Sequence, residues 1–241
     1  MAAVSDQRAA QLAANLRSLE ERITRACDAT GRARSAVSLI AVTKTFPAAD
    51  VLALAGLGLR DFGENRDAEA RDKARALAAL DPPAPDLRWH FVGRLQRNKC
   101  RSVATYADVV HSVDRVEVAR ALDEGAHRAD RYLDVMVQVS LDADPGRGGA
   151  EMAAVAAVAD ACATATRLRL TGVMAIAPLD ADPGDAFSRL AGISAQVSAA
   201  HEGAHAISAG MSNDLEAALR HGATHLRVGT ALLGHRTPPP G

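Results

Sequence analysis

The feature of this sequence that most constrains its fold is a repeated alternation of short apolar runs with longer helical patterns. The apolar runs predict strands at residues 39–44, 61–64, 89–93, 109–113, 134–140, 171–176, 205–209 and 226–230. Alanine-rich helical patterns lie between them at residues 48–57, 67–80, 115–128, 150–166, 185–200 and 213–220. About eight strand–helix units in a row, with no long polar linker, favour a closed (β/α)8 barrel over an open doubly wound sheet.

A helix is also predicted before the first strand, at residues 5–30, where leucine and isoleucine recur at helical spacing. We therefore expect an α/β protein with one TIM-type (β/α)8 barrel domain and an extra N-terminal helix, spanning residues 1–236. The proline-rich residues 237–241 are expected to form a disordered tail. Residues 81–85 are expected to be a stiff loop within one unit and not a domain boundary.

The composition excludes several classes of partner. The formal net charge is −1 with both signs interspersed, and aromatic residues make up 3% of the chain, so no nucleic acid is expected as a partner. No apolar run approaches membrane-spanning length and no signal peptide is recognised, so no membrane is expected either. The three cysteines lie far apart without metal-ligand spacing, which predicts small buried residues and a cytoplasmic location.

Lys44 follows the apolar run at residues 39–42, and the choice of lysine is unusual for this chain. Only three of the 28 basic residues are lysine, and the rest are arginine. Arginine does not lose its proton in a protein, whereas a lysine can do so and attack a carbonyl to form a Schiff base. Lys44 is therefore a candidate nucleophile. The alternative is a lysine whose charged end simply reaches solvent from the end of a strand.

Two further strand ends carry a phosphate-binding pattern, at the carboxyl face where barrels collect their chemistry. Gly-Met-Ser at 210–212 precedes a helical pattern that Ser212 is placed to cap. Arg-Val-Gly-Thr at 227–230 ends the last strand with a glycine whose backbone can approach a ligand closely. Opposite a strand-end lysine, these loops indicate a phosphate ligand that carries an aldehyde. Pyridoxal 5′-phosphate (PLP) fits that description.

Several longer motifs occur in order along the chain. They are Ala-Val-Thr-Lys-Thr at 41–45, Phe-Gly-Glu-Asn at 62–65, Trp-His-Phe-Val-Gly at 89–93, Gly-Val-Met at 172–174, Gly-Met-Ser at 210–212 and Gly-Ala-Thr-His-Leu-Arg-Val-Gly-Thr at 222–230. Together they resemble the YggS/PROSC family, the pyridoxal phosphate homeostasis proteins. The match runs in register from the first helix to Arg236, so chance similarity does not account for it.

The resemblance implies a barrel like the N-terminal domain of alanine racemase, the type III fold of PLP proteins, with the cofactor held as an internal aldimine on Lys44. It implies phosphate contacts from Ser212, Gly229 and Thr230, and it places Arg227 beside the pyridine nitrogen. Four more residues are expected around the cofactor, namely Asn65, His90, Met174 and Met211. The implied function is intracellular PLP homeostasis, with storage of PLP and delivery to apoenzymes without substantial turnover, by a protein expected to be a monomer.

The chain departs from the family pattern at the rim of the expected site. Arg66 and Ala68 stand where the family usually has an aromatic residue and a glutamine. Arg94 stands where a proline is common, and Arg97 where a small residue is. None of these positions is expected to contact the Schiff base or the phosphate, so the changes concern partner surfaces and not cofactor binding.

The residue type at Arg227 also bears on activity. A guanidinium only donates hydrogen bonds, so Arg227 at the ring nitrogen would keep that nitrogen unprotonated. An unprotonated ring is a poor electron sink for carbanion chemistry. Without the resemblance, an arginine in the barrel lumen paired with a carboxylate such as Glu64 is an equal alternative.

Two alternatives to a PLP carrier stay open. One is a PLP-dependent amino-acid racemase, which needs a second acid/base opposite the lysine. Alanine racemases take a tyrosine for this role from an additional domain of a partner subunit, whereas Tyr106 and Tyr132 here precede the fourth and fifth strands and are expected at the opposite end of the barrel. The other alternative is a barrel that binds a different phosphate metabolite without a Schiff base.

The remaining polar patterns favour structural roles. Segment 142–149 lacks the ligands of a calcium loop and is expected to be an ordinary turn. Segment 96–101 predicts a basic helix start with a solvated face. No metal site is predicted, and surface or capping roles are expected for His111, His127, His201, His205, His221, His225 and His235.

Overall fold

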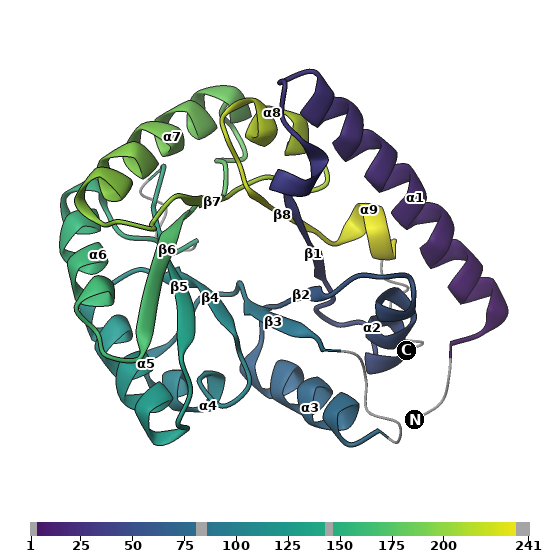
Figure 1. Cartoon of the computed structure of the whole chain (residues 1–241), viewed down its shortest axis with the longest axis horizontal. Coiled ribbons are helices and arrows are strands. Elements are labelled where there is room, and N and C mark those ends of the chain that lie inside the picture. The colour runs from purple at the N-terminus through teal and green to yellow at the C-terminus, as the bar shows by residue number, and fades with distance from the viewer. Residues whose placement is uncertain (1–3, 81–85, 143–146, 235–241) are drawn as a thin grey trace.

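Eight parallel strands close into a barrel in this computed structural model, in sequence order and with the last strand paired to the first (Figure 1). The structure describes residues 4–80, 86–142 and 147–234. The strands are β1 (Ser38–Val42), β2 (Asp61–Glu64), β3 (Arg88–Phe91), β4 (Val109–Val113), β5 (Leu133–Gln138), β6 (Leu168–Met174), β7 (Ala206–Ser208) and β8 (His225–Val228). The predicted barrel is confirmed, and β2 and β4 have the predicted bounds. The expected loop at 81–85 and tail at 237–241 lie outside the described residues.

Helices surround the strands as an outer ring (Figure 1). They are α1 (Asp6–Asp28), α2 (Ala48–Gly56), α3 (Asp67–Ala78), α4 (Cys100–Val103), α5 (Val116–Arg128), α6 (Val155–Ala163), α7 (Pro183–Ala200), α8 (Leu215–Arg220) and α9 (Thr230–Leu233). Single turns of 3-10 helix, η1 (Arg34–Ala36), η2 (Arg97–Lys99) and η3 (Met152–Ala154), precede β1, α4 and α6. The basic helix start predicted at 96–101 corresponds to η2 and the beginning of α4, whereas the short helix α9 was not predicted. No described helix combines the length and apolar character of a membrane span.

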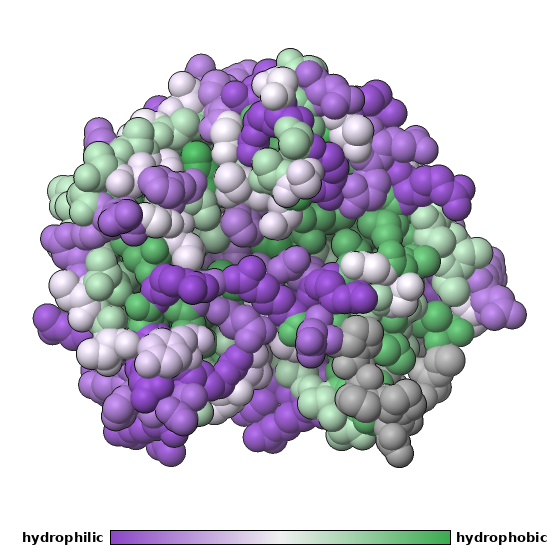
Figure 2. Space-filling view, in the orientation of Figure 1, coloured by the Kyte–Doolittle hydropathy of each residue, from purple (hydrophilic) through white to green (hydrophobic). Residues whose placement is uncertain are grey.

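Most strand residues are buried, as the apolar runs predict, although β3 and β6 each contain an exposed arginine and β7 is partly exposed. Every residue of β4 and β5 is buried, since one face of each strand meets the helices and the other fills the lumen. The three cysteines are buried free thiols, as expected. In the orientation of Figure 1, this face of the molecule mixes hydrophilic and hydrophobic side chains. A hydrophobic area is visible near the middle, between hydrophilic groups (Figure 2).

Helix α1 completes the outer ring where the regular repeat falls short. The helix that follows β8, α9, has only four residues and cannot cover β8 and β1 by itself. Helix α1 packs along α9, α8 and α2 at this position and buries Leu12, Leu19 and Ile23 (Figure 1). The predicted extra N-terminal helix is therefore part of the barrel wall, and its Asn15 side chain donates to the carbonyl of Leu232 at 2.9 Å.

The helix predicted at residues 150–166 begins later than expected. Gly148 and Gly149 have φ values of 70° and 108°, and they turn the chain back onto the end of β5. There the Ala150 N–H donates to the carbonyl of Gln138 at 2.7 Å and its carbonyl accepts from the Ser140 N–H at 2.9 Å. Ala150 thus forms a bridge to the chain just after β5 and the turn η3 follows it, because tertiary pairing overrides helix propensity at this position.

Candidate cofactor site

A hollow at the carboxyl ends of β1, β2 and β8 brings most of the predicted site residues together. It has a volume of about 330 Å³ and adjoins a second space of about 450 Å³, with which it shares Lys44 and Asn65. Both volumes lie within the usual range for small-molecule sites. Seven of the nine predicted residues line the first space, and they are Lys44, Asn65, Met211, Ser212, Arg227, Gly229 and Thr230.

The predicted range 39–44 placed Lys44 inside the first strand. In the structure, Lys44 lies in a tight turn just beyond β1. The β1–β2 pairing ends at Val42, and the Phe46 N–H then donates to the carbonyl of Thr43 at 3.0 Å. Thr45, the third residue of this turn, has a φ of 70°, a conformation that glycine normally supplies. The turn leaves the Lys44 side chain exposed at the edge of both spaces.

A different lysine, Lys73 on α3, is buried and braces this turn. Its ammonium group donates to the Thr43 carbonyl at 2.7 Å, to Glu64 at 2.6 Å and to Glu69 at 2.8 Å, which uses all three of its donors. Glu69 also accepts the N–H of Thr45. The peptide groups on both sides of Lys44 are therefore held by one buried ion-pair cluster. Because Glu64 binds Lys73, the alternative that it pairs with Arg227 is wrong.

The loop that carries Ser212 is held from outside the barrel. Arg22 of α1 donates to the Ser212 carbonyl at 2.6 Å and to the Glu216 carboxylate at 2.6 Å. The prediction that Ser212 caps the following helix is wrong, because α8 starts at Leu215 and its first turn takes no side-chain cap. The Ser212 hydroxyl instead accepts the N–H of Ala231 in α9 at 3.1 Å. Ser212 thus joins the two loops expected to bind phosphate.

Gly229 lies directly between Val42 and α9. A side chain at this position would bring its Cβ to 3.3 Å from the Val42 carbonyl oxygen, a tight contact that glycine avoids while leaving the backbone open to the hollow. Thr230 follows at the start of α9 with an exposed side chain. The first N–H groups of a helix have no partner inside it, so this segment can donate to an anion.

Arg227 forms the inner wall of the hollow with its guanidinium already oriented. Nη1 donates to the Ser208 hydroxyl at 2.6 Å and Nη2 to the Ala175 carbonyl at 2.9 Å. Burial lowers the pKa of Arg227 to about 10, so the group remains charged at neutral pH. Its hydrogen-bond partners are neutral, which leaves its positive charge available to a ligand.

His90 and Met174 do not line the hollow. Both lie deeper in the lumen, where Met174 packs against Val109 and Met136. His90 bonds to His111 and Asp61. Since the barrel interior is filled by layers of side chains, these two residues belong to the packed interior and not to the hollow.

The predicted surface or capping role of His111 is wrong. The side chain is completely buried, and its Nδ1 lies 2.8 Å from the Ser208 hydroxyl. In the sequence, valine stands two residues before and two residues after His111, at Val109 and Val113, which is the pattern that could have indicated an inward position. Ser208, which links His111 to Arg227, was missed because serine before a turn is common.

Asn65 supplies the clearest sign that the hollow is built for a polar ligand. Its Oδ1 atom is buried and has no hydrogen-bond partner within the described part of the chain, although buried amide oxygens are normally paired. The residue is fixed by Gly93, at which a Cβ would lie 2.2 Å from the Asn65 carbonyl oxygen. A ligand with a hydrogen-bond donor would satisfy Asn65.

The donors and apolar groups around the hollow fit PLP. Lys44 offers an amine for an aldehyde, Arg227 a charged donor for a ring nitrogen, and the two loops hydroxyl and N–H donors for a phosphate. Apolar side chains that the sequence had not singled out complete the walls, namely Val42, Val92 and Ile176. An aromatic ring with polar substituents needs this combination of walls and donors.

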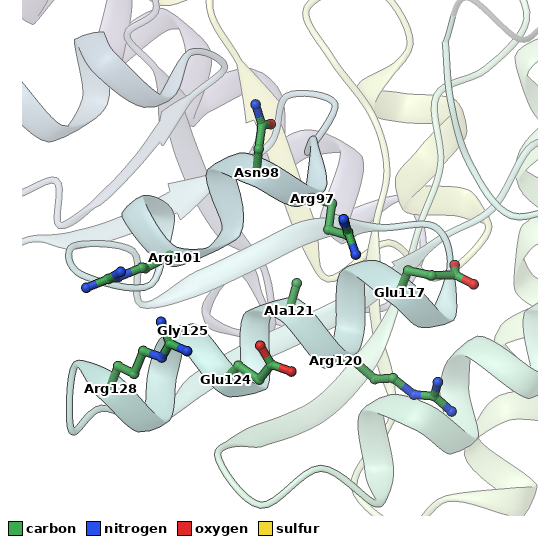
Figure 3. Close-up of a pocket in the computed structure, with 9 residues that line it drawn as sticks. All are labelled: Arg97, Asn98, Arg101, Glu117, Arg120, Ala121, Glu124, Gly125 and Arg128. Atoms are coloured by element: carbon green, nitrogen blue, oxygen red, sulfur yellow. The ribbon is translucent and has the colours of Figure 1, made fainter.

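A separate hollow of about 460 Å³ lies in the outer helix layer, between the η2–α4 segment and α5 (Figure 3). Charged side chains dominate its lining, with Arg97 and Arg101 on one side and Glu117, Arg120, Glu124 and Arg128 of α5 on the other (Figure 3). The basic helix start predicted at 96–101 forms one side of it. Because no strand end reaches this hollow, its position is that of a solvated groove between helices and not that of a barrel active site.

Fold and site together define a barrel of the alanine racemase type. The family model described as "Alanine racemase, N-terminal domain" matches residues 9–237. The chain belongs, more closely, to the family of pyridoxal phosphate homeostasis proteins. It is 44% identical over 243 residues to the pyridoxal phosphate homeostasis protein of Mycobacterium tuberculosis (strain ATCC 25618 / H37Rv). This match covers 95% of the present chain and 94% of the relative.

Solved structures agree with this assignment. PipY of Synechococcus elongatus PCC7942, solved with PLP bound, is 34% identical and superposes with a TM-score of 0.80, covering 93% of this chain and 100% of PipY. Alanine racemase from Corynebacterium glutamicum is 17% identical with a TM-score of 0.67, covering 93% of this chain and 60% of the racemase. The second likeness concerns the fold alone. The predicted family resemblance is confirmed.

Proposed function

We propose that this protein binds PLP through a Schiff base with Lys44 and acts in PLP homeostasis, storing the cofactor and delivering it to apoenzymes. The observation that carries the proposal is the convergence of Lys44, Arg227 and the Ser212 and Gly229–Thr230 loops on one hollow. The related PipY, solved with PLP bound, supports the same ligand. When bound, PLP would supply a reactive aldehyde on an aromatic ring, and the protein would supply attachment and orientation.

Each residue has a distinct part in this proposal. Ser212, Gly229 and Thr230 bind the phosphate, and Arg227 donates to the ring nitrogen. Asn65 accepts a hydrogen bond from the ligand through its unpartnered Oδ1. The exposed position of Lys44 lets water and incoming amines reach the attachment point, which suits release and transfer. We further propose a cytoplasmic monomer that contacts apoenzymes transiently.

We also propose that the protein lacks substantial catalytic turnover. Two-base racemisation needs an acid/base opposite Lys44. Neither Tyr106 nor Tyr132 lines the hollow. The ring of Tyr132 instead packs against the Arg167 guanidinium, whose Cζ lies 4.7 Å from the ring centre. A donor-only guanidinium at the ring nitrogen further disfavours carbanion chemistry, because it cannot give that nitrogen a proton readily.

Transfer and turnover can be measured on the same PLP-loaded protein. We expect it to activate an apoenzyme, measured as holoenzyme activity against an equal concentration of free PLP. We expect no racemisation, transamination or decarboxylation of common L-amino acids, measured by chiral chromatography after long incubation. Racemisation at an ordinary enzymatic rate, roughly 1 s⁻¹ or faster, and lost in Lys44→Ala, would assign the protein as a racemase instead.

The phosphate loops make a prediction of their own. Charge-assisted hydrogen bonds contribute about 1.5–3 kcal/mol each, or roughly tenfold or more in affinity. The double variant Ser212→Ala with Thr230→Val should therefore reduce the affinity for PLP at least about tenfold more than the affinity for pyridoxal, which has no phosphate. Titrations of both ligands, followed by absorbance, give the ratio. Equal losses for the two ligands would place the phosphate elsewhere.

A further inference from the structure

A line of polar side chains crosses the lumen behind Arg227. Its Nη1 donates to the Ser208 hydroxyl at 2.6 Å, and that oxygen lies 2.8 Å from His111 Nδ1. His111 Nε2 lies 2.9 Å from His90 Nδ1, and His90 Nε2 lies 2.8 Å from the Asp61 carboxylate. The five residues come from β8, β7, β4, β3 and β2, so the line passes from one side of the barrel to the other.

The line connects the two ends of the barrel. Arg227 lines the hollow at the carboxyl end, while Asp61 is the first residue of β2 and its side chain is 25% exposed. Ser208, His111 and His90, which lie between them, are all buried. Buried polar groups in a low-dielectric interior must be fully paired, so every proton in this line has a defined place.

The charges at the two ends are opposite and fixed. A guanidinium can only donate, and an ionised carboxylate can only accept. Although burial acts to raise it, the pKa of Asp61 is lowered, because His90 donates to it and Arg88 lies nearby. Burial lowers the pKa of His90 and lowers that of His111 strongly, so both rings are neutral and each has one donor and one acceptor.

Only one arrangement of protons satisfies the whole line. Ser208 accepts from Arg227 and donates to His111 Nδ1, His111 donates from Nε2 to His90, and His90 donates from Nε2 to Asp61. If His111 donated to Ser208 instead, a neutral His90 would face the carboxylate with a lone pair. Both histidines are therefore the Nε2–H tautomer, and every hydrogen bond points away from the hollow.

We propose that Ser208, His111, His90 and Asp61 are positioning residues that hold the Arg227 guanidinium toward the ring nitrogen of the cofactor through this one-directional chain. The assignment rests on the proposed function, because it gives Arg227 the ring nitrogen as its ligand. Successive bonds of the same polarity strengthen one another. The carboxylate at the far end fixes the direction of the bonds, whereas Asp214, which lines the hollow, acts to raise the pKa of Arg227 against the effect of burial.

The tautomers of the two histidines test the chain without any ligand. Nitrogen and carbon NMR of histidine-labelled full-length protein, free of cofactor, should show both His90 and His111 as neutral rings protonated at Nε2. Signals are assigned with His90→Gln and His111→Gln. An Nδ1–H tautomer at either ring, or a doubly protonated ring at neutral pH, would overturn the proposal.

A ligand pair tests the effect on Arg227. Ser208→Ala removes the link and should weaken PLP about tenfold, the value of one charge-assisted hydrogen bond. It should leave the affinity for 1-deaza-PLP, with carbon in place of the ring nitrogen, nearly unchanged. His225→Gln is the matched control, since its ring lies 6.2 Å from that of His111 but bonds to Thr224, outside the chain. We expect this control to bind both ligands as the unchanged protein does.

Failure of this proposal is distinguishable from failure of the proposed function. If the unchanged protein does not bind PLP, the proposed function fails, while the tautomers still report whether the chain exists. Suppose that PLP binds, but that Ser208→Ala weakens the binding of PLP and of its deaza analogue equally, or weakens the binding of neither. The side chains are then structural and the positioning role is overturned.

Discussion

Replacement of Lys44 by alanine should abolish covalent capture of PLP. The unchanged protein with PLP should be yellow, and borohydride should trap a pyridoxyl group on the peptide that contains Lys44, as mass mapping would reveal. In Lys44→Ala, we expect the trapped adduct to fall to background and the Schiff-base absorbance to disappear. Non-covalent binding should persist, because the phosphate loops and Arg227 do not depend on the lysine side chain.

The chain offers a well-matched control for this experiment, since it contains only three lysines. Lys99→Ala removes a half-exposed lysine that lies 4.0 Å from Asp67 and outside the hollow. That variant should capture PLP as the unchanged protein does. A pyridoxyl group found only on Lys73 or Lys99 would contradict the proposed attachment, and an adduct that survives in Lys44→Ala would do the same.

Replacement of Lys73 by methionine should give the largest loss of stability. Its ammonium group and the Glu64 carboxylate are both buried, and removal of one partner of a buried pair costs about 3–5 kcal/mol because the other charge is left unpaired. Urea unfolding monitored by circular dichroism would measure the loss. Lys99→Met should cost less than about 1 kcal/mol, because the Lys99 side chain is 49% exposed and lies as far as 4.0 Å from Asp67. Equal losses in the two variants would contradict the cluster's role.

The pH dependence of the stability of Lys73→Met would identify the unpaired Glu64 carboxylate as the cause of the stability loss. Burial raises the pKa of Glu64, and loss of Lys73, which acts to lower it, raises that pKa further. A carboxyl whose pKa is higher in the folded than in the unfolded protein stabilises the folded state at pH values below its unfolded pKa. This stabilisation is lost as the pH rises through the folded pKa. The deficit of Lys73→Met should therefore be largest at alkaline pH and shrink on acidification. Adding Glu64→Gln should recover part of the stability at neutral pH.

The fold and the outline of the site were accessible from sequence because they depend on local patterns. Apolar runs and helical periodicity indicate elements, and the order of elements limits the topology to few choices. The rule that barrel chemistry collects at the carboxyl ends of strands then selected Lys44, Arg227, Gly229 and Thr230, which the structure brings together. The family motifs added Asn65 and Met211, which also line the hollow.

What each polar side chain contacts was decided only by the tertiary structure. The sequence alone determined an eight-stranded barrel with polar strand ends and selected Lys44, but it did not show that Lys73 is buried and holds the turn that carries Lys44. Ser212 reads as a helix cap until α9, far along the chain, takes its hydroxyl. His111 looks like one of many isolated histidines until three strands, β3, β4 and β7, place it between His90 and Ser208. Burial and hydrogen bonding depend on partners distant in sequence, and only the closed barrel supplies them.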